Sequence, residues 1–99
     1  MIRIRISDEA FADLEEGYWF YELQEAGLGE YFAAELRADV EGLRVSAGIH
    51  RRGYHDYHRL LSRVFPYAIY YTFKENEVIV WAVIDCRRDP EWVRNHLDL

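Results

Sequence analysis

Cysteine, lysine and long apolar runs are scarce in this sequence of 99 residues. The single cysteine, Cys86, cannot form a bridge within the chain, which excludes a disulfide framework and fits a reducing compartment. No window approaches the roughly 20 apolar residues of a membrane span. The first residues, MIRIRISDEA, lack the apolar core of a signal peptide. We therefore expect a cytoplasmic protein with no membrane-spanning segment.

Linker-like stretches are also missing, because no segment is enriched in proline, glycine or serine. This predicts that residues 1–99 form a single domain. Hydrophobic residues make up 51% of the chain and aromatic residues 16%, which is enough apolar surface to close one core by packing alone. His50, His55 and His58 do not have a spacing typical of zinc ligands, so we predict no metal site and no other cofactor. We expect these histidines to lie on a surface loop and strand.

Charge is distributed unevenly along the chain. The formal net charge is −6, which argues against a protein that coats nucleic acid by bulk attraction to phosphate. Residues 1–42 contain 11 acidic residues against three arginines, whereas the remainder contains seven acidic residues against nine basic ones. The segment 44–63 has five arginines against Asp56, a local charge of +4. These are Arg44, Arg51, Arg52, Arg59 and Arg63. Any anionic ligand is expected to bind there.

The first half of the sequence predicts one strand and two helices. Isoleucines at positions 2, 4 and 6 alternate with arginines, the period of a strand with one buried face. Ser7 is a suitable N-cap for a helix over residues 8–26, whose core stripe would be Phe11, Leu14, Tyr18 and Tyr21. Glycines in the segment 26–29 end this helix, and a helical period resumes at Phe32 and lasts until Gly48. The two helices should pack as an antiparallel hairpin.

After a basic loop, the second half predicts three strands and a final helix. Residues 57–64, 67–73 and 78–84 are rich in aromatic and β-branched residues and are separated by turn signals, the second turn being 74–77. The last of these strands is apolar on both faces, so we place it in the centre of the sheet. Asp89 and Pro90 open a short helix that extends to about Leu97. The predicted fold class is α+β, with the element order β-α-α-β-β-β-α.

Four segments, taken together, resemble the RelE/ParE superfamily of type II toxins, often called plasmid-stabilisation proteins. They are Ala12-Asp13-Leu14-Glu15-Glu16 with the aromatic run 18–21, Gly27-Leu28-Gly29 followed by Phe32, the segment 63–71 with its Phe-Pro-Tyr, and Ala82-Val83-Ile84 leading to Arg87-Arg88-Asp89-Pro90. The resemblance implies a helical hairpin packed on one face of a small, twisted, mainly antiparallel sheet. It also implies the toxin component of a toxin–antitoxin pair that inhibits growth.

The superfamily contains ribosome-dependent mRNA-cleaving toxins like RelE and gyrase-directed toxins like ParE, so the resemblance leaves the chemistry open. For a RelE-like nuclease, the resemblance implies catalytic residues at four places. These are lysines before the Phe-Pro-Tyr position, an arginine just after its tyrosine, an arginine after the last strand and a C-terminal tyrosine. Here His58 and Arg59 replace the lysines, Ala68 replaces the first arginine, and residues 91–97 contain no tyrosine. Only Arg87 or Arg88 matches the second arginine.

We therefore expect a ParE-like toxin that is not a nuclease and that binds a target such as DNA gyrase. A metal-independent mRNA interferase of RelE type, acting at the ribosome, is the first alternative. A detoxified relative that only binds a partner is the second.

Four arginines are candidates for a catalytic or target-binding site, namely Arg59, Arg63, Arg87 and Arg88. Arg59 and Arg63 are two strand steps apart on one face, which would suit a phosphate or carboxylate clamp, or else a solvated face or ion pairs to the acidic helices. Arg87 and Arg88 end an apolar strand beside a helix start, where either a contact to the target or a salt bridge to Asp85 or Asp89 fits. Arg51 and Arg52 of the basic loop complete the binding candidates.

The aromatic run 18–21 supplies two further contact candidates. Its residues cannot all face one way, because successive helical residues are about 100° apart. With Tyr18 and Tyr21 in the core, Trp19 or Phe20 is left partly outward to contact an antitoxin or a second copy. We predict that a cognate antitoxin folds on contact, covers the helical hairpin and pairs with an open sheet edge. A homodimer and a toxin–antitoxin hetero-oligomer both remain open.

Overall fold

The computed structural model describes residues 1–98. The first strand, β1 (Arg3–Ile6), leads to Ser7, whose Oγ accepts a hydrogen bond from the Ala10 N–H at 3.1 Å and caps α1 (Asp8–Glu22) as predicted. α1 ends at Glu22 and not at residue 26. The Glu22 carboxylate accepts hydrogen bonds from the N–H groups of Gly27 and Gly29 at 3.1 and 3.0 Å, which closes a tight connection to the next helix.

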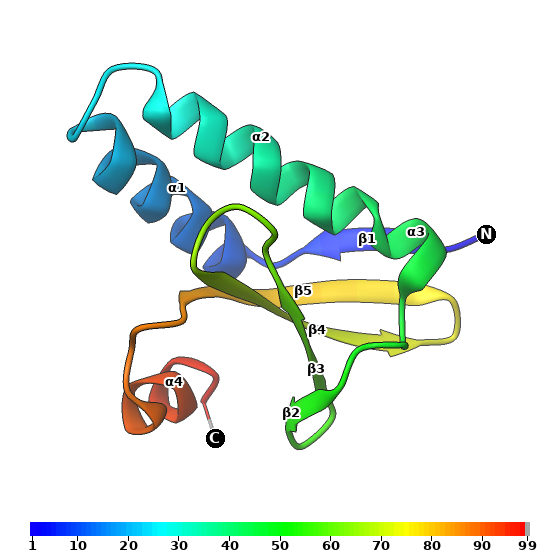
Figure 1. Ribbon diagram of the computed structural model, residues 1–99. Helices are drawn as coiled ribbons and strands as arrows, with labels where there is room; N and C mark the ends of the chain where they lie inside the picture. The colour runs from blue at the N-terminus through cyan, green and yellow to red at the C-terminus, as the bar shows by residue number, and fades with distance from the viewer. Residues whose placement is uncertain (99) are drawn as a thin grey trace.

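Two further helices follow before the sheet resumes. α2 (Leu28–Glu41) runs antiparallel beside α1 as the expected hairpin (Figure 1), and α3 (Leu43–Ser46) adds one short turn after Gly42. The helical period that was predicted to continue to Gly48 is therefore divided at Gly42 and ends at Ser46.

The second half forms four strands and a helix. These elements are β2 (Arg52–Tyr54), β3 (Tyr57–Leu61), β4 (Tyr67–Lys74), β5 (Glu77–Asp85) and α4 (Pro90–His96). β2 was not predicted, because it lies in the segment expected to be a basic loop. β3 ends at Leu61 and not at residue 64, since Phe65 turns into the core, where its ring contacts those of Tyr21 and Phe32.

The sheet has five strands in the order β1-β5-β4-β3-β2. All neighbours are antiparallel except β1 and β5, so the predicted mainly antiparallel sheet with a central last strand is confirmed. A bulge in β5 pairs Tyr71 with Val80 and Tyr70 with Ala82, which leaves Trp81 as the extra residue. The bulge changes which β5 residues face the α1–α2 hairpin. Before the bulge these are Val78 and Val80, and after the bulge it is Val83.

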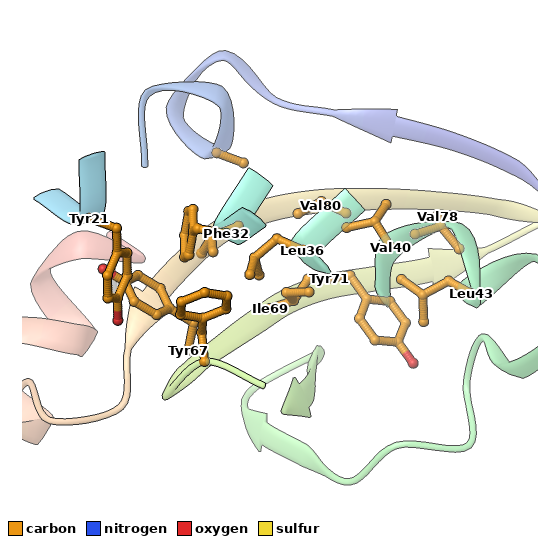
Figure 2. Close-up of a cluster of buried hydrophobic side chains, with 13 residues drawn as sticks. Tyr21, Phe32, Leu36, Val40, Leu43, Tyr67, Ile69, Tyr71, Val78 and Val80 are labelled. Carbon is orange, nitrogen blue, oxygen red and sulfur yellow. The ribbon is translucent and has the colours of Figure 1, made fainter. Parts of the chain in front are cut away.

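The hairpin and the sheet enclose the main core (Figure 2). Phe32 and Leu36 of α2 are fully buried against Ile69 and Tyr71 of β4 and Val80 of β5. A smaller apolar cluster lies on the opposite face of the sheet beneath α4. It contains Ala68, Tyr70, Ala82, Ile84, Val93 and Leu97. The sheet is therefore fully covered on the hairpin side and covered by only one short helix on the other.

Three details differ from the predictions. Phe11 is 60% exposed and Tyr18 is half-buried, and both lie outside the core, because α1 buries Ala10, Gly17 and Tyr21 instead. Lys74 ends β4 and is not in the turn, which consists of Glu75 and Asn76 at φ of 53° and 62°. His58 is buried and not on the surface, since its ring stacks on Tyr71.

None of the helices formed by the described residues is long and apolar enough to cross a membrane.

Candidate functional site

The sheet face opposite the hairpin contains a cleft of about 380 Å³ between the β3–β5 region and the start of α4. We call it the arginine cleft. Its lining residues are Tyr54, Arg59, Ala68, Tyr70, Ile84, Asp85, Cys86, Arg88, Pro90 and Val93. Pairing between β3 and β4 sets Arg59 opposite Tyr70, and the chain after β5 brings Arg88 to the other side. Two of the four candidate arginines therefore meet in one hollow.

Tyr70 and Arg59 form the β-strand wall of the arginine cleft. Burial raises the pKa of the Tyr70 phenol, and the adjacent Arg59 guanidinium acts in the opposite direction. The phenol consequently stays neutral at physiological pH and offers a hydroxyl beside a fixed positive charge.

Arg88 is held at the opposite wall by the aromatic side chain of α4. Its guanidinium carbon lies 4.2 Å from the centroid of the Trp92 ring, a cation–π contact. Trp92 in turn stacks on His96 with ring centroids 4.7 Å apart. The first turn of α4 is capped by Asp89, whose Oδ1 accepts a hydrogen bond from the Trp92 N–H at 2.8 Å. This arrangement directs a cation toward the cleft.

Arg87 and Asp85 form an ion pair at the rim. Both oxygens of Asp85 accept hydrogen bonds from the Arg87 side chain, Oδ1 from Nε at 2.9 Å and Oδ2 from Nη2 at 2.6 Å. These bonds lower the pKa of the Asp85 carboxyl. From the sequence, either a target contact or a salt bridge was expected for Arg87 and Arg88. Arg87 forms the salt bridge, to Asp85, and Arg88 lines the cleft.

The predicted clamp of Arg59 with Arg63 is wrong. Arg63 lies beyond the end of β3, and its Nε is 3.5 Å from Oδ1 of Asp39 on α2, on the hairpin side of the sheet. The ion pair to the acidic helices, considered as an alternative, is the arrangement that forms.

The remaining candidates are dispersed over the surface. Arg51 is exposed beside the cleft, where its carbonyl accepts a hydrogen bond from the Arg59 N–H at 2.9 Å, whereas Arg52 lines a separate hollow with Asp56 and Lys74. Trp19 and Phe20 are 52% and 49% exposed, so both aromatic side chains point outward, where one was expected. Trp19 lies in a groove along the hairpin, and Phe20 lines a crevice near Trp92.

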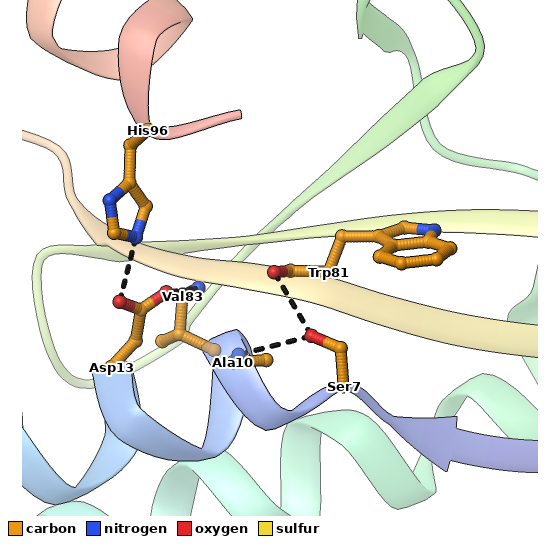
Figure 3. Close-up of polar contacts among 6 residues, drawn as sticks. All are labelled: Ser7, Ala10, Asp13, Trp81, Val83 and His96. Atoms are coloured by element: carbon orange, nitrogen blue, oxygen red, sulfur yellow. Dashed lines mark hydrogen bonds and ion pairs between the residues drawn. The ribbon is translucent and has the colours of Figure 1, made fainter. Parts of the chain in front are cut away.

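Sequence reasoning missed a polar link between α1, β5 and α4 (Figure 3). Asp13 Oδ2 accepts a hydrogen bond from the Val83 N–H at 2.9 Å, and its Oδ1 lies 2.7 Å from His96 Nε2. Burial is the main cause of the raised pKa of the Asp13 carboxyl. Partners 70 and 83 residues apart cannot be matched from a single sequence. The only available signal was the acidic residue on the buried side of α1.

Among the described residues, no group of three or more histidine, cysteine, aspartate or glutamate side chains is arranged to hold a metal ion.

The sequence model of the family described as the ParE toxin of the type II toxin–antitoxin system parDE matches residues 4–90. The chain belongs to the ParE toxin family. By family it is therefore a type II toxin. The resemblance to the RelE/ParE superfamily is confirmed, and the chain is more similar to ParE than to RelE. Comparison with curated protein sequences finds no relative.

Two solved structures share the fold of this ParE-family toxin. The chromosomal ParDE system from P. aeruginosa matches with a TM-score of 0.77 and 17% identity, covering 86% of this chain and 96% of that one. The isolated E. coli RelE toxin matches with a TM-score of 0.64 and 16% identity, covering 96% and 95%. At these identities the two matches establish the α+β fold of this ParE-family chain. They do not assign roles to its individual residues.

Proposed function

We propose that this ParE-family toxin inhibits growth by binding a protein target such as DNA gyrase through the arginine cleft, without cleaving RNA. The observation that carries this proposal is the chemistry of the cleft. Arg59 and Arg88 supply positive charge at its two walls, while Ala68 and Val93 contribute only apolar surface. Such a site can bind a carboxylate or phosphate on a partner surface and anchor an interface.

A general base is poorly provided in the same cleft, although Tyr54 and Tyr70 present phenol hydroxyls to it. Metal-free RNA cleavage needs a base for the 2′-hydroxyl and an acid for the leaving oxygen. No histidine or lysine is among the described residues that line the cleft. The only carboxylate, Asp85, is bound on both oxygens by Arg87, and its lowered pKa makes it a weak base. Binding is therefore the better use of this cleft.

A cognate antitoxin would neutralise the toxin by docking on the hairpin. Phe11 and Trp19 lie exposed in a groove formed by α1 and α2, an apolar surface suited to a segment that folds on contact. On one side of the sheet, the part of β5 that continues past β1 is covered by α1, since Ser7 and Asp13 bind its backbone groups at Trp81 and Val83. The β2–β3 edge is the better place for an added strand, because β3 continues past β2 to Leu61.

Supercoiling by purified DNA gyrase tests the target. We expect the toxin to inhibit the reaction and the double variant Arg59→Ala, Arg88→Ala to require at least roughly 30-fold more protein, because an arginine anchor in an interface contributes about 2 kcal/mol or more. Arg94→Ala is the matched control, since Arg94 is an exposed arginine of α4 that does not line the cleft. Growth arrest in cells with undiminished gyrase activity would contradict gyrase as the target.

A RelE-type mRNA interferase is the second candidate, because the fold also matches that of the isolated E. coli RelE toxin. Cleavage of transcripts at the ribosome distinguishes it from the gyrase binder.

A further inference from the structure

Arg88 lines two adjoining hollows of the molecule. One is the arginine cleft, and the other is a smaller crevice of about 140 Å³ between α1 and α4. Arg88 is exposed, and it forms no ion pair with any of the residues 1–98 that the structure describes. A long side chain without a charged partner has many rotamers, and fixing it on binding weakens the affinity. Arg88 therefore binds a target anion well only if another group already holds it in place.

Trp92 supplies such a hold. The Arg88 guanidinium carbon lies 4.2 Å from the centroid of the Trp92 ring, which is half-buried and packs on the smaller apolar cluster beneath α4. The attraction between a guanidinium and an aromatic face is electrostatic and depends on where the ring lies. Asp89 and Pro90 fix the first turn of α4, so the two backbone segments keep their relative position.

His96 and Asp13 restrain the Trp92 ring. The His96 ring stacks on Trp92 with centroids 4.7 Å apart and an angle of 14° between the ring planes. His96 Nε2 lies 2.7 Å from Asp13 Oδ1, and the other Asp13 oxygen accepts a hydrogen bond from the Val83 N–H at 2.9 Å (Figure 3). The Asp13 side chain is only 11% exposed, so its carboxylate is held against β5. A continuous series of contacts thus connects β5 to Arg88. We call it the Asp13–Arg88 network, and its members are Asp13, His96, Trp92 and Arg88.

The Asp13–Arg88 network is distinct from the packing that holds α4 on the sheet. Val93 and Leu97 are buried in the smaller apolar cluster and anchor the helix there. A leucine in place of Trp92 would fill part of the same apolar space, but it would offer no aromatic face to a guanidinium. Substitution at this position therefore separates packing from positioning.

We propose that Trp92 is a positioning residue for target binding and presents Arg88 to the anionic group of the partner. In this role the Trp92 ring is kept in place by His96 and Asp13. The inference rests on the proposed function, in which the arginine cleft binds a carboxylate or phosphate of the target. It assigns one wall of the cleft to α4 and its link to α1, whereas Arg59 at the other wall is placed by the pairing of β3 with β4.

Nuclear magnetic resonance of the toxin tests the positioning without any partner. Protons of the Arg88 side chain lie over an aromatic ring, so they should resonate upfield of those of Arg94, an exposed arginine of α4. Trp92→Phe should keep part of this upfield shift, and Trp92→Leu should abolish it. Absence of the shift at Arg88 in the unaltered toxin would overturn the proposal, whatever the toxin binds.

Inhibition of purified DNA gyrase by single and double variants tests the role in binding. Trp92→Leu should require roughly fivefold more toxin, the upper range for an exposed cation–π contact, and Trp92→Phe at most roughly twofold more. Combined with Arg88→Ala, Trp92→Leu should have no further effect, because a residue that acts only through another is not additive with it. Combined with Arg59→Ala, the effect of Trp92→Leu should remain.

Two further variants complete this test. His96→Ala should weaken inhibition in the same direction as Trp92→Leu, and its effect should also disappear in combination with Arg88→Ala. Trp81→Leu is the matched control and should leave inhibition unchanged, since Trp81 is also half-buried but bonds to Thr72 of β4 and does not line the cleft. Thermal unfolding verifies that each variant is folded at the assay temperature. If Trp92→Phe is no better than Trp92→Leu, or if Trp92→Leu still weakens the Arg88→Ala toxin, Trp92 is a packing residue and the proposal is wrong.

Failure of the proposed function is recognised separately. If the unaltered toxin does not inhibit gyrase, or if Arg88→Ala inhibits it equally well, the cleft does not bind this target and the proposed function fails. Inorganic phosphate is then the probe for Arg88. Its resonances should respond to lower phosphate concentrations in the unaltered toxin than in Trp92→Leu, and an equal response in both would overturn the positioning role.

Discussion

Gly17 and Phe32 control how closely the two helices of the hairpin approach. A Cβ added at Gly17 would lie 2.6 Å from Cζ of Phe32, and Phe32 is completely buried among other aromatic rings. The ring cannot move aside without displacing Tyr67 or Phe65, whose centroids are 4.9 and 5.2 Å away. The absence of a side chain at position 17 is therefore a packing requirement.

Gly17→Ala should destabilise the fold by about 1–3 kcal/mol, the usual cost of overpacking a closed core. Gly42→Ala is the matched control, because the nearest atom to its added Cβ is at 3.4 Å and its φ of −60° suits alanine. The unfolding free energy of Gly42→Ala should equal that of the unaltered protein or exceed it by up to about 1 kcal/mol. Urea denaturation followed by fluorescence measures both. Equal stability of the two variants would show that Phe32 relaxes easily.

His50 and Tyr71 link the basic segment to the core. The Tyr71 hydroxyl accepts a hydrogen bond from the Gly48 N–H at 3.1 Å and lies 2.6 Å from His50 Nδ1. When His50 is neutral with its proton on Nε2, its Nδ1 accepts the proton of this hydroxyl. Burial, together with the neighbouring His58, lowers the pKa of His50.

This arrangement predicts a loss of stability in mild acid. The folded state takes up a proton on His50 less readily than the unfolded state, whose histidine has a pKa of about 6.5. The unfolding free energy should therefore fall as pH drops from about 6.5 to the lower folded-state pKa of His50. His50→Gln, which keeps an acceptor for Tyr71 but does not titrate, should show a smaller difference between about pH 7.5 and pH 5.5. An unchanged pH profile in this variant would exclude His50 as the cause.

At the scale of elements, local patterns predicted β1, the hairpin, β4, β5 and α4. The isoleucine alternation, the Ser7 cap and the doubly apolar run before Asp85 each report on neighbours along the chain. β2 escaped prediction because it has three residues and pairs irregularly with β3, so no alternation develops. The end of α1 was placed too late, because residues 23–26 are good helix formers and hide the turn in which the Glu22 carboxylate accepts hydrogen bonds from Gly27 and Gly29.

The candidate site was predictable only in part. Arg59 and Arg88 were both named from the sequence, and the structure places them in one cleft. Arg63 and Arg87 were equally plausible, but their ion pairs with Asp39 and Asp85 depend on which face each side chain reaches. Residue type and spacing do not contain that information.

Asp13 joins three elements, so its replacement tests how α1 covers the edge of β5. Asp13→Ala removes the acceptor of the Val83 N–H and the partner of His96, which should cost about 1–3 kcal/mol of stability. Asp13→Asn should lose less, because its amide oxygen can still accept from Val83. Thermal unfolding and amide hydrogen exchange at Val83 report the two effects. Identical stability of both variants would mean that this hydrogen bond contributes nothing.

At the scale of the whole molecule, the two candidate surfaces lie on opposite sides of the sheet. The groove lined by Phe11 and Trp19 lies on the acidic α1–α2 hairpin, and the arginine cleft lies on the sheet face that carries α4. Figure 1 shows the hairpin and α4 on opposite sides of the sheet. A helix bound only in the groove would leave the cleft open. An antitoxin that blocks the target must therefore also reach around a sheet edge, and the β2–β3 edge borders the cleft at Tyr54 and Arg59.

As a whole molecule, the toxin should cleave no transcript, with or without ribosomes. Losing one transition-state donor typically lowers a rate about 100-fold to 1,000-fold. Here the arginine position of the RelE-like pattern is Ala68, and α4 contains no tyrosine to act as an acid. Two such losses leave little catalysis, and Asp85 is neutralised by Arg87. Transcript ends mapped on translating ribosomes during toxin induction provide the measurement. Codon-specific cuts that disappear with Arg59→Ala or Arg88→Ala, but persist with Arg94→Ala, would establish the arginine cleft as a nuclease site.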